Sequence, residues 1–497
     1  MNVFLMYKDR DFDPQRDLPG NEKALTQDLE LKTLFNAMAL DDEFLFEVSR
    51  KAVLCGEGDL DTILYRQNIL KDCLKNTLVA RGIYALAVEA TERGRKSFFF
   101  FYRKSPSLYS CIELLGIYMD VLKKLRTVID KNIEKFGSEG FSALFAMLRK
   151  ELSDEYFTTV QEHLKELNFR RGILISAELG KGNEGINHVL RKPTDKKRRL
   201  MQLIFRQKQP VYTFYLHPRD EAGGRILSEI QDRGIRGVVN ALAQSTEHIR
   251  TFFATLRTEL AFYIGCLNLH ENLAQMGAPT AYPQPAHAEE RRHSSKGLYD
   301  ACLALTMKQN IVGNDLPADN KNLVIITGAN QGGKSTFLRS IGLSQLMMQC
   351  GMFVPAKSFC SSVCDGIFTH FKREEDASMK SGKLDEELGR MSEIVDNIHA
   401  NSMILLNESF AATNEREGSE IARQIISALT ERDVKVFFVT FLSEFARGFY
   451  ENKTENAVFL VAERQADGGR NFKIVEGEPL RTGYGRDLYA TIFGMAD

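Results

Sequence analysis

A glycine-rich stretch in the second half of the chain has residue types and a spacing that suit phosphate binding. Gly328 and Gly333 enclose four residues and are followed by Lys334 and Ser335, the pattern of a phosphate-binding loop. Glycines let backbone N–H groups close around a β-phosphate, the lysine ammonium reaches the β- and γ-phosphate oxygens, and the serine hydroxyl ligates Mg²⁺. The sequence therefore predicts a site for ATP and Mg²⁺. The predicted nucleotide contacts are Gly328, Ala329, Asn330, Gln331, Gly332, Gly333, Lys334, Ser335 and Thr336.

A second group of polar residues follows an apolar run further along the chain. Residues 402–406 are mainly apolar and are followed by Asn407 and Glu408. A carboxylate in this position orients or deprotonates the water that attacks ATP, which makes Glu408 the predicted catalytic base. The Asn407 amide oxygen accepts a hydrogen bond from Mg²⁺-bound water but carries no charge. We therefore predict Ser335 and Asn407 as Mg²⁺ ligands, Asn407 through water, with weak metal binding.

These side chains require buried strands and a helix to position them. Residues 323–326 are apolar and precede the loop, and Phe337, Leu338 and Ile341 recur at helical spacing after it. The apolar residues 436–440 indicate a further strand. The order of strand, loop and helix predicts an α/β domain around the site.

The first half of the chain is mostly helical by its hydrophobic periodicity. Apolar residues recur at spacings of three and four over residues 114–129, and again over residues 249–267, where they predict a long lever helix. Glycine and proline residues at 277–285 end this pattern. The predicted fold combines a helical core and lever domain, a small β-containing insertion, and an α/β domain. The predicted segments are residues 1–168 (helical core and lever, first part), 169–218 (insertion), 219–280 (lever and core, second part) and 281–497 (α/β domain).

The predicted insertion combines β character with positive charge. Residues 172–178 and 211–216 have strand character, and residues 180–183 form a turn signal between candidate strands. The same segment holds the densest basic cluster of the chain. Its members are Arg191, Lys192, Lys196, Lys197, Arg198 and Arg199. A charge run of this kind is either a solvated face or a set of phosphate contacts, because loop-borne Lys and Arg residues grip DNA without reading its sequence.

Composition sets limits on the class of protein. The chain has 497 residues, is 43% hydrophobic and carries a net charge of −1, so any DNA contact must come from local basic patches. No run reaches the roughly 18 apolar residues of a membrane span, and the N-terminus lacks a signal-peptide pattern. We predict a cytoplasmic protein with no membrane contact and with reduced, mostly buried cysteines. Cys360, Cys364 and His370 have metal-like spacing, but three ligands are fewer than a structural zinc site uses, which favours a packed connector.

The same motifs carry a resemblance to a known family. The loop TGANQGGKST resembles the phosphate-binding loop of the MutS mismatch-repair ATPases, which belong to the ABC-type ATPase superfamily, with Ala329 and Gln331 in place of Pro and Met. The resemblance continues through further collinear segments, and one upstream segment resembles the start of the MutS core domain. These segments are residues 351–356, 367–371 and 404–418 downstream of the loop and residues 59–76 upstream.

The resemblance implies an ABC-type P-loop ATPase domain that works as a dimer. Residues 376–390 resemble the signature loop that reaches the γ-phosphate of the opposite subunit, with Ser381 as the implied serine and Ser378 as the alternative. A loop that acts in trans implies a homodimer. Two departures from the family pattern imply slow hydrolysis, with ATP acting mainly as a switch. Asn407 replaces an Asp, and Phe441 replaces a His that senses the γ-phosphate.

The implied function is ATP-dependent DNA binding of the kind used in mismatch repair and related DNA repair. In this interpretation the insertion is a DNA clamp that nucleotide state opens and closes. The segment before Asp59 is too short for the mismatch-reading and connector domains of MutS, so we expect a short family member that binds branched or distorted DNA without wedging a mispair. The alternative from another class is a nucleotide-gated protein scaffold that does not grip DNA. A metabolite kinase is a third option, but it leaves the signature-loop likeness unexplained.

Overall fold

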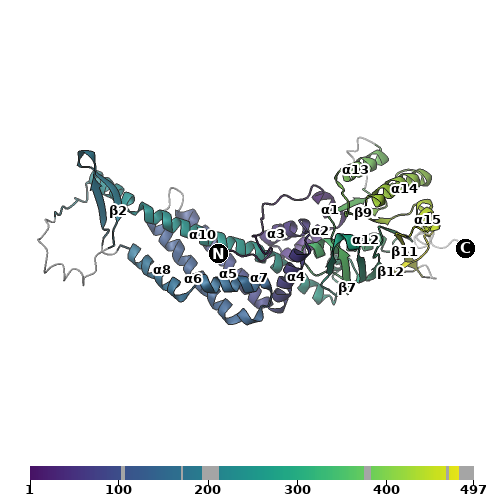
Figure 1. Cartoon of the computed structure of the whole chain (residues 1–497), viewed down its shortest axis with the longest axis horizontal. Helices are drawn as coiled ribbons and strands as arrows, with labels where there is room; N and C mark the ends of the chain where they lie inside the picture. Colours follow the sequence, from purple (N-terminus) through teal and green to yellow (C-terminus); the bar gives the residue numbers. More distant parts are fainter. Residues whose placement is uncertain (102–106, 170–171, 193–211, 374–381, 466–468, 481–497) are drawn as a thin grey trace. The chain divides into compact units, whose positions relative to one another are not determined.

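The computed structural model describes residues 1–101, 107–169, 172–192, 212–373, 382–465 and 469–480. The chain forms two compact units (Figure 1). Unit 1 consists of Met1–Val3, Gly82–Ile133 and Leu144–Arg257, and unit 2 of Phe4–Arg81, Glu134–Ala143 and Thr258–Asp497. The described residues confirm the prediction of a fold that is part helical and part α/β.

Unit 1 is built mainly from long helices. The apolar stripe predicted over residues 114–129 lies in one of them, where Leu114, Tyr118 and Leu125 are buried. Tyr118 stacks on Phe253 of the helix that holds the second predicted stripe, with ring centroids 6.1 Å apart. The helices are α5 (Thr77–Phe101), α6 (Leu108–Asn132), α7 (Glu139–Glu151), α8 (Asp154–Leu167) and α10 (Glu221–Gln275), and the 3-10 turn η1 (Ile133–Lys135) follows α6. The first residues of α5 and α7 belong to unit 2. α10 ends two residues before Gly277, as the turn signals predict, and it contributes residues to both units.

A two-stranded hairpin belongs to unit 1. Strand β1 (Ile175–Leu179) pairs antiparallel with β2 (Gly185–Leu190), and the turn η2 (Lys181–Asn183) lies where residues 180–183 predict one. The strand expected over residues 211–216 is wrong for the described residues 212–216, which have no regular structure. Their aromatic side chains are more than 80% exposed, so they have the alternating β-prone composition of a strand but no buried face against which a strand would pack.

Unit 2 contains four helices near the N-terminus of the chain and a small four-stranded sheet formed by later residues. The helices are α1 (Glu22–Asp28), α2 (Leu31–Ala39), α3 (Glu43–Leu54) and α4 (Leu60–Lys75). Asp42 and Asp59 cap the N-termini of α3 and α4 by accepting backbone N–H groups, the usual role of Asp at this position. The sheet has the order β3-β7-β4-β5. Its strands are β3 (Gln284–Ala286), β4 (His293–Leu298), β5 (Asn314–Pro317) and β7 (Ser358–Ser362), and η3 (Ala288–Glu290) precedes β4.

A six-stranded sheet forms the centre of the α/β part of unit 2. Its order is β12-β11-β6-β10-β9-β8, and all neighbouring pairs are parallel except β11 and β12. The strands are β6 (Leu323–Gly328), β8 (Ile367–Phe371), β9 (Met403–Asn407), β10 (Lys435–Val439), β11 (Ala457–Arg464) and β12 (Arg470–Glu476). Because β6, β9 and β10 are parallel, their carboxyl ends lie at one edge of the sheet, which brings Gly328, Asn407 and Thr440 together.

Helices cover both faces of this sheet (Figure 1). On one face Ile325, Leu406 and Phe438 pack with buried residues of α13, α14 and α15. On the other face α12 lies so close that a Cβ atom at Gly342 would stand 2.5 Å from Leu405 Cδ1. The helices of this region are α11 (Ala301–Met307), α12 (Lys334–Gln349), α13 (Lys383–Asn397), α14 (Glu415–Glu431) and α15 (Ser443–Glu451). The sheet is therefore buried on both faces, which explains the continuous apolar runs of its strands.

The two units divide the chain differently from the predicted segments 1–168, 169–218, 219–280 and 281–497. Residues 4–81 group with the α/β part, and the boundary inside α10 falls between Arg257 and Thr258. All eight cysteines are buried, and none of them forms a disulfide bond. Within the described ranges, none of the helices combines the length and the apolar character that crossing a bilayer requires.

Candidate nucleotide-binding site

The glycine-rich loop joins β6 to α12 at the carboxyl edge of the six-stranded sheet. β6 is buried along its whole length, and α12 begins at Lys334 after Gly333, whose φ is +85°. Gly328 has a φ of +116°, and a Cβ atom there would lie 2.7 Å from the backbone nitrogen of Ala462 on β11. A side chain at Gly328 would therefore collide with backbone that is fixed by the sheet. The loop has the conformation and the close approach to β11 that only glycine permits.

Lys334 is folded back onto its own loop. Its Nζ atom donates hydrogen bonds to the carbonyl oxygens of Gly328 at 3.0 Å and Ala329 at 2.9 Å. The residue is only 5% exposed, and this burial lowers the pKa of the ammonium to about 8, against the opposing effect of the Glu408 carboxylate. A buried ammonium that is held by two neutral carbonyl groups is a favourable place for an anion.

Ser335 and Asn407 are brought together from α12 and β9. The Ser335 hydroxyl donates a hydrogen bond to Asn407 Oδ1 at 2.8 Å. Asn407 ends β9, and Val439 pairs with it on the neighbouring strand β10. The two oxygens offer hard but uncharged ligands, which fit a Mg²⁺ ion that keeps several of its waters. Their roles as metal ligands remain predictions.

Glu408 and Phe441 lie just after the carboxyl ends of β9 and β10, at the same edge of the sheet. Glu408 has a left-handed backbone, with a φ of +54°, and its N–H donates to the carbonyl of Val439 at 2.8 Å. This hydrogen bond ties the residue after β9 to the end of β10. Phe441 follows the buried Thr440, whose Oγ1 accepts the N–H of Leu442 at 3.0 Å. Both residues line the pocket in front of the loop.

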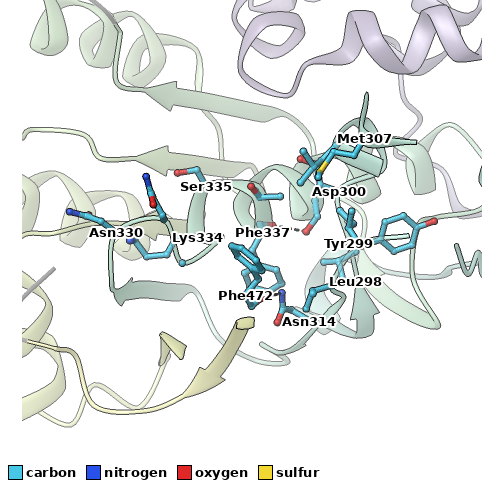
Figure 2. A pocket seen from close by; sticks show the side chains of 18 of the residues that line it. Leu298, Tyr299, Asp300, Met307, Asn314, Asn330, Lys334, Ser335, Phe337 and Phe472 are labelled. Atoms are coloured by element: carbon cyan, nitrogen blue, oxygen red, sulfur yellow. Dashed lines mark hydrogen bonds between the residues drawn. The ribbon is translucent and has the colours of Figure 1, made fainter. Parts of the chain in front are cut away.

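This pocket has a volume of about 540 Å³, with the glycine-rich loop at a polar end and mainly apolar side chains, beside Asp300 and Asn314, at the other end (Figure 2). The polar end contains Lys334, Ser335 and Glu408, together with the loop residues from Asn330 to Thr336. The apolar side chains at the second end, apart from Phe337, were not singled out by the sequence patterns. They are Leu298, Tyr299, Leu303, Met307, Ile311, Val312, Phe337 and Phe472. The volume and the mixture of ends suit a ligand with a phosphate chain and a flat apolar part.

Phe472 is held at the mouth of this pocket by Asn314. The Asn314 amide donates to the carbonyl of Phe472 at 3.1 Å and accepts the N–H of Ile474 at 2.8 Å, so one side chain holds the backbone of β12 directly after Phe472. Phe472 has a φ of +59° and is 48% exposed. A large aromatic side chain that is half exposed in a left-handed conformation is a signal of function that appears only in three dimensions.

Arg470 adds a further contact that the sequence patterns missed. Its Nε atom donates to the carbonyl oxygen of Asn330 in the loop at 3.1 Å. The contact joins β12 to the phosphate-binding loop. The residues around Arg470 give no local signal of this contact, because the contact forms only when β12 pairs antiparallel with β11.

Several predicted site residues lie outside the described residues. Ser381 and its alternative Ser378 are among them, and so are Lys196, Lys197, Arg198 and Arg199. Arg191 and Lys192 are described, exposed and engaged by neighbours in unit 1. Arg191 Nε donates to Ser176 Oγ at 2.9 Å, and Lys192 Nζ forms an ion pair with Glu166 at 3.0 Å.

The cysteine and histidine residues with metal-like spacing have other partners. Both ring nitrogens of His370 lie within hydrogen-bond distance of protein atoms, at 2.7 Å from Ser409 Oγ and 3.1 Å from the Glu387 carbonyl oxygen. The Cys364 thiol donates to Gln349 Oε1 at 2.9 Å. In the part of the chain that the structure describes, no group of three or more Cys, His, Asp or Glu side chains is arranged to hold a metal ion.

Comparison with known families covers both halves of the chain. Residues 58–276 match the MutS2 N-terminal domain, and residues 324–490, which contain the glycine-rich loop, Asn407 and Glu408, match MutS domain V. The chain belongs to the MutS family. This agrees with the resemblance carried by the loop and by the segments that follow it.

Individual relatives of the MutS family align with part of the chain. A DNA mismatch repair protein MutS from Thermotoga sp. (strain RQ2) is 34% identical over 244 residues, which is 46% of this chain and 30% of that protein. MutS from Thermotoga maritima is 33% identical over the same length and shares. The DNA mismatch repair protein MSH3 of Coccidioides immitis is 27% identical over 212 residues, 41% of this chain and 19% of that protein. The aligned region thus spans less than a third of each of these relatives.

Proposed function

We propose that this MutS-family chain is an ATPase that binds DNA in a nucleotide-dependent manner. The observation that carries the proposal is the meeting of Lys334, Ser335 and Glu408 at one end of a pocket whose other end is mainly apolar, with Asn407 bonded to Ser335. Lys334 and the N–H groups of residues 330–336 would hold the phosphates of ATP, and Leu298, Met307 and Phe472 would contact the base. The P-loop ATPase domain then corresponds to the α/β part of unit 2.

Mg²⁺ fits the donors at Ser335 and Asn407. When bound, the ion would neutralise phosphate charge and polarise the γ-phosphoryl group. Glu408 lines the pocket and is the proposed base that takes a proton from the attacking water. Asn407 contributes no negative charge, and Phe441 offers no hydrogen-bond donor. We therefore propose slow hydrolysis, in which the bound nucleotide acts mainly as a switch.

Nucleotide binding tests this proposal directly. A fluorescent ATP analogue should bind the purified protein with Mg²⁺, and Lys334→Ala should remove most of the binding. Lys435→Ala is the matched control, because Lys435 is a half-buried lysine whose Nζ also donates to carbonyl oxygens, at 3.0 Å from Ala318 and 3.4 Å from Arg291, but it lies outside the pocket. Equal binding by wild type and Lys334→Ala would refute the assignment.

The proposed quaternary arrangement is a homodimer with composite sites. The resemblance implies that Ser381 of one subunit reaches the nucleotide of the other. Mixtures of Lys334→Ala and Ser381→Ala chains should then regain part of the ATPase activity, because each heterodimer has one intact composite site. Analytical ultracentrifugation with ATP and Mg²⁺ provides the second measurement. A monomer at every concentration would contradict the arrangement.

The proposed DNA contact lies in the hairpin region of unit 1, as a clamp-like insertion. Lys192 is 75% exposed at its side chain and pairs with Glu166, so a DNA phosphate would replace an exposed and weak ion pair. Lys192→Ala should weaken DNA binding and flatten its salt dependence by roughly 0.9 in the logarithmic slope. Lys124→Ala is the control, because Lys124 is another exposed lysine of unit 1 paired with a glutamate, Glu89, at 2.8 Å.

The preferred form of DNA is a separate part of the proposal. We propose branched or otherwise distorted DNA, with little preference for a single mismatch over a perfect duplex. Gel-shift measurements with perfect, mismatched, forked and four-way DNA, each with and without ATP, test it. A clear preference for the mismatched duplex would contradict this part alone.

A second candidate function is a nucleotide-gated scaffold that binds a protein partner and does not grip DNA. The contacts of Arg191 with Ser176 and of Lys192 with Glu166 favour it, because both basic groups already have partners within unit 1. Measuring DNA binding at increasing salt concentration distinguishes the two functions. A scaffold would show no DNA binding that depends on Lys192 at any salt concentration.

A further inference from the structure

The Lys334 ammonium has three partners, and the third is an aromatic ring. Two of its protons point to the carbonyl oxygens of Gly328 and Ala329. On another side the centre of the Phe441 ring lies 4.2 Å from Nζ, inside the range of a cation–π contact. The direct contacts of Nζ with described residues are thus with neutral groups, and the Glu408 carboxylate acts on the ammonium from a longer distance.

Phe441 is fixed in place by the strand that precedes it. β10 lies between β6 and β9, and the Thr440 N–H donates to the carbonyl of Ile326 on β6 at 3.1 Å. The Thr440 hydroxyl then accepts the N–H of Leu442. The backbone is thus held on both sides of Phe441 while its ring stays 38% exposed in the pocket. The backbone hydrogen bonds therefore fix the point from which the Phe441 ring enters the pocket.

A phenyl ring is unable to donate a hydrogen bond to a phosphate, but its face attracts a cation. We propose that Phe441 is a positioning residue that holds Lys334 folded back on Gly328 and Ala329, and that it thereby reduces the affinity of the site for ATP and ADP. The inference rests on the proposed function, since it assigns a means of regulating the same site. A phosphate chain must draw Nζ away from the two carbonyls and the ring before it gains the ammonium as a partner.

Substitutions that keep or remove the aromatic ring distinguish a cation–π role of Phe441 from simple apolar packing. Tyr keeps the aromatic face, whereas Leu and Met keep an apolar side chain without it. Loss of the ring should therefore favour the nucleotide-bound state. For a contact on a partly exposed ring we expect Phe441→Leu to bind ATP and ADP roughly fivefold more tightly than wild type. Phe441→Tyr should bind them with the wild-type affinity.

The experiment is equilibrium binding of fluorescent ATP and ADP analogues to the full-length chain, with displacement by AMP as a further arm. AMP lacks the β- and γ-phosphates to which such a lysine binds, so its affinity should be the same in wild type, Phe441→Leu and Phe441→Tyr. Phe441→Met is the second non-aromatic variant and should reproduce the effect of Leu. Thermal unfolding followed by circular dichroism identifies any variant that fails to fold.

Phe472→Leu provides a contrast within the same pocket. It also removes an aromatic ring, but one that we assign to the base, so it should weaken the binding of ATP, ADP and AMP alike. Tighter binding in Phe441→Leu and Phe441→Met but not in Phe441→Tyr supports the inference. Equal affinities in all Phe441 variants, or weaker binding in Leu and Met, would overturn it. If wild type itself binds no more ATP than Lys334→Ala, the proposed function fails, which is a different result.

Discussion

The Ser335 hydroxyl and the Asn407 amide oxygen are 2.8 Å apart and join the first turn of α12 to the end of β9. The hydrogen bond fills the position in which an aspartate would accept the same proton with a full negative charge. A charged acceptor would attract Mg²⁺ more strongly than an amide does, because the ion prefers carboxylate oxygen. In the proposed Mg²⁺ site, the Ser335–Asn407 contact therefore keeps two oxygen ligands close together but supplies no negative charge.

Replacing Asn407 with Asp should restore that charge. We expect Asn407→Asp to lower the Mg²⁺ concentration needed for half-maximal ATPase activity and to raise the maximal rate. A single preorganised charge contact at a phosphoryl-transfer site is worth on the order of 3 kcal/mol, or about a hundredfold in rate. Steady-state ATPase assays over a Mg²⁺ titration measure both effects. Asn407→Ser is the neutral control, and a gain of the same size in that variant would show that charge is not the cause.

Glu408 should separate hydrolysis from binding. Because its carboxylate lines the pocket and serves as the proposed base, Glu408→Gln should lower kcat by about a hundredfold or more. The Kd for ATP should change little, since the amide has a similar shape and the backbone contact of Glu408 with Val439 does not involve the side chain. Single-turnover hydrolysis and equilibrium binding give the two values. An unchanged kcat would exclude Glu408 as the base.

Gly328 should tolerate no side chain. A Cβ atom at this position would lie 2.7 Å from the nitrogen and 2.9 Å from the oxygen of Ala462, and its φ of +116° is unfavourable for any other residue. We expect Gly328→Ala to destabilise the chain by about 1–3 kcal/mol and to abolish ATP binding. Gly389→Ala is the control, because a Cβ atom on this residue of α13 meets nothing within 4 Å. Denaturant unfolding and ATP binding, measured on both variants, should differ between them.

The residues at the polar end of the site were predictable because their signals are local. Lys334 and Ser335 follow the glycines directly, and Asn407 and Glu408 end an apolar run, so each pattern fits within a few residues. The parallel sheet then brings the separate strand ends together, as α/β topology requires. The structure adds the particular hydrogen bonds, including the one between Ser335 and Asn407.

The apolar end of the pocket had no such signal. Leu298 ends β4, Met307 ends α11 and Phe472 lies on β12. β4 and β12 belong to different sheets, so these residues come together only in the folded chain. Each residue is an ordinary apolar residue in sequence. Residues 4–81 group with the α/β part through contacts between residues more than 200 positions apart, such as those of Asn21 with Ile367 and of Asp28 with Arg373, which no local pattern signals.

Glu259 on α10 provides the clearest of these distant contacts. Its carboxylate is fully buried and accepts three backbone N–H groups of the N-terminal segment, from Leu5 at 2.5 Å, Met6 at 3.2 Å and Phe12 at 2.7 Å. Burial raises the pKa of this carboxyl group to about 7, against the opposite effect of the three donors. The folded state therefore binds the Glu259 proton more tightly than the unfolded chain does.

The stability of unit 2 should consequently fall as the pH rises through the pKa of Glu259. The contribution of the raised pKa is fully present below about pH 4.5, the value for an exposed glutamate, and is lost as the pH passes about 7. The loss amounts to about 3 kcal/mol, since each pKa unit corresponds to about 1.4 kcal/mol. Glu259→Gln keeps an acceptor oxygen but does not titrate, so the difference in unfolding free energy between it and wild type should change with pH by that amount. Urea unfolding at pH 5, 6, 7 and 8 measures the difference. Glu271→Gln is the control on the same helix, because Glu271 is 49% exposed and pairs with Arg81 at the surface. A constant difference between wild type and Glu259→Gln from pH 5 to 8 would show that Glu259 does not take up a proton on folding.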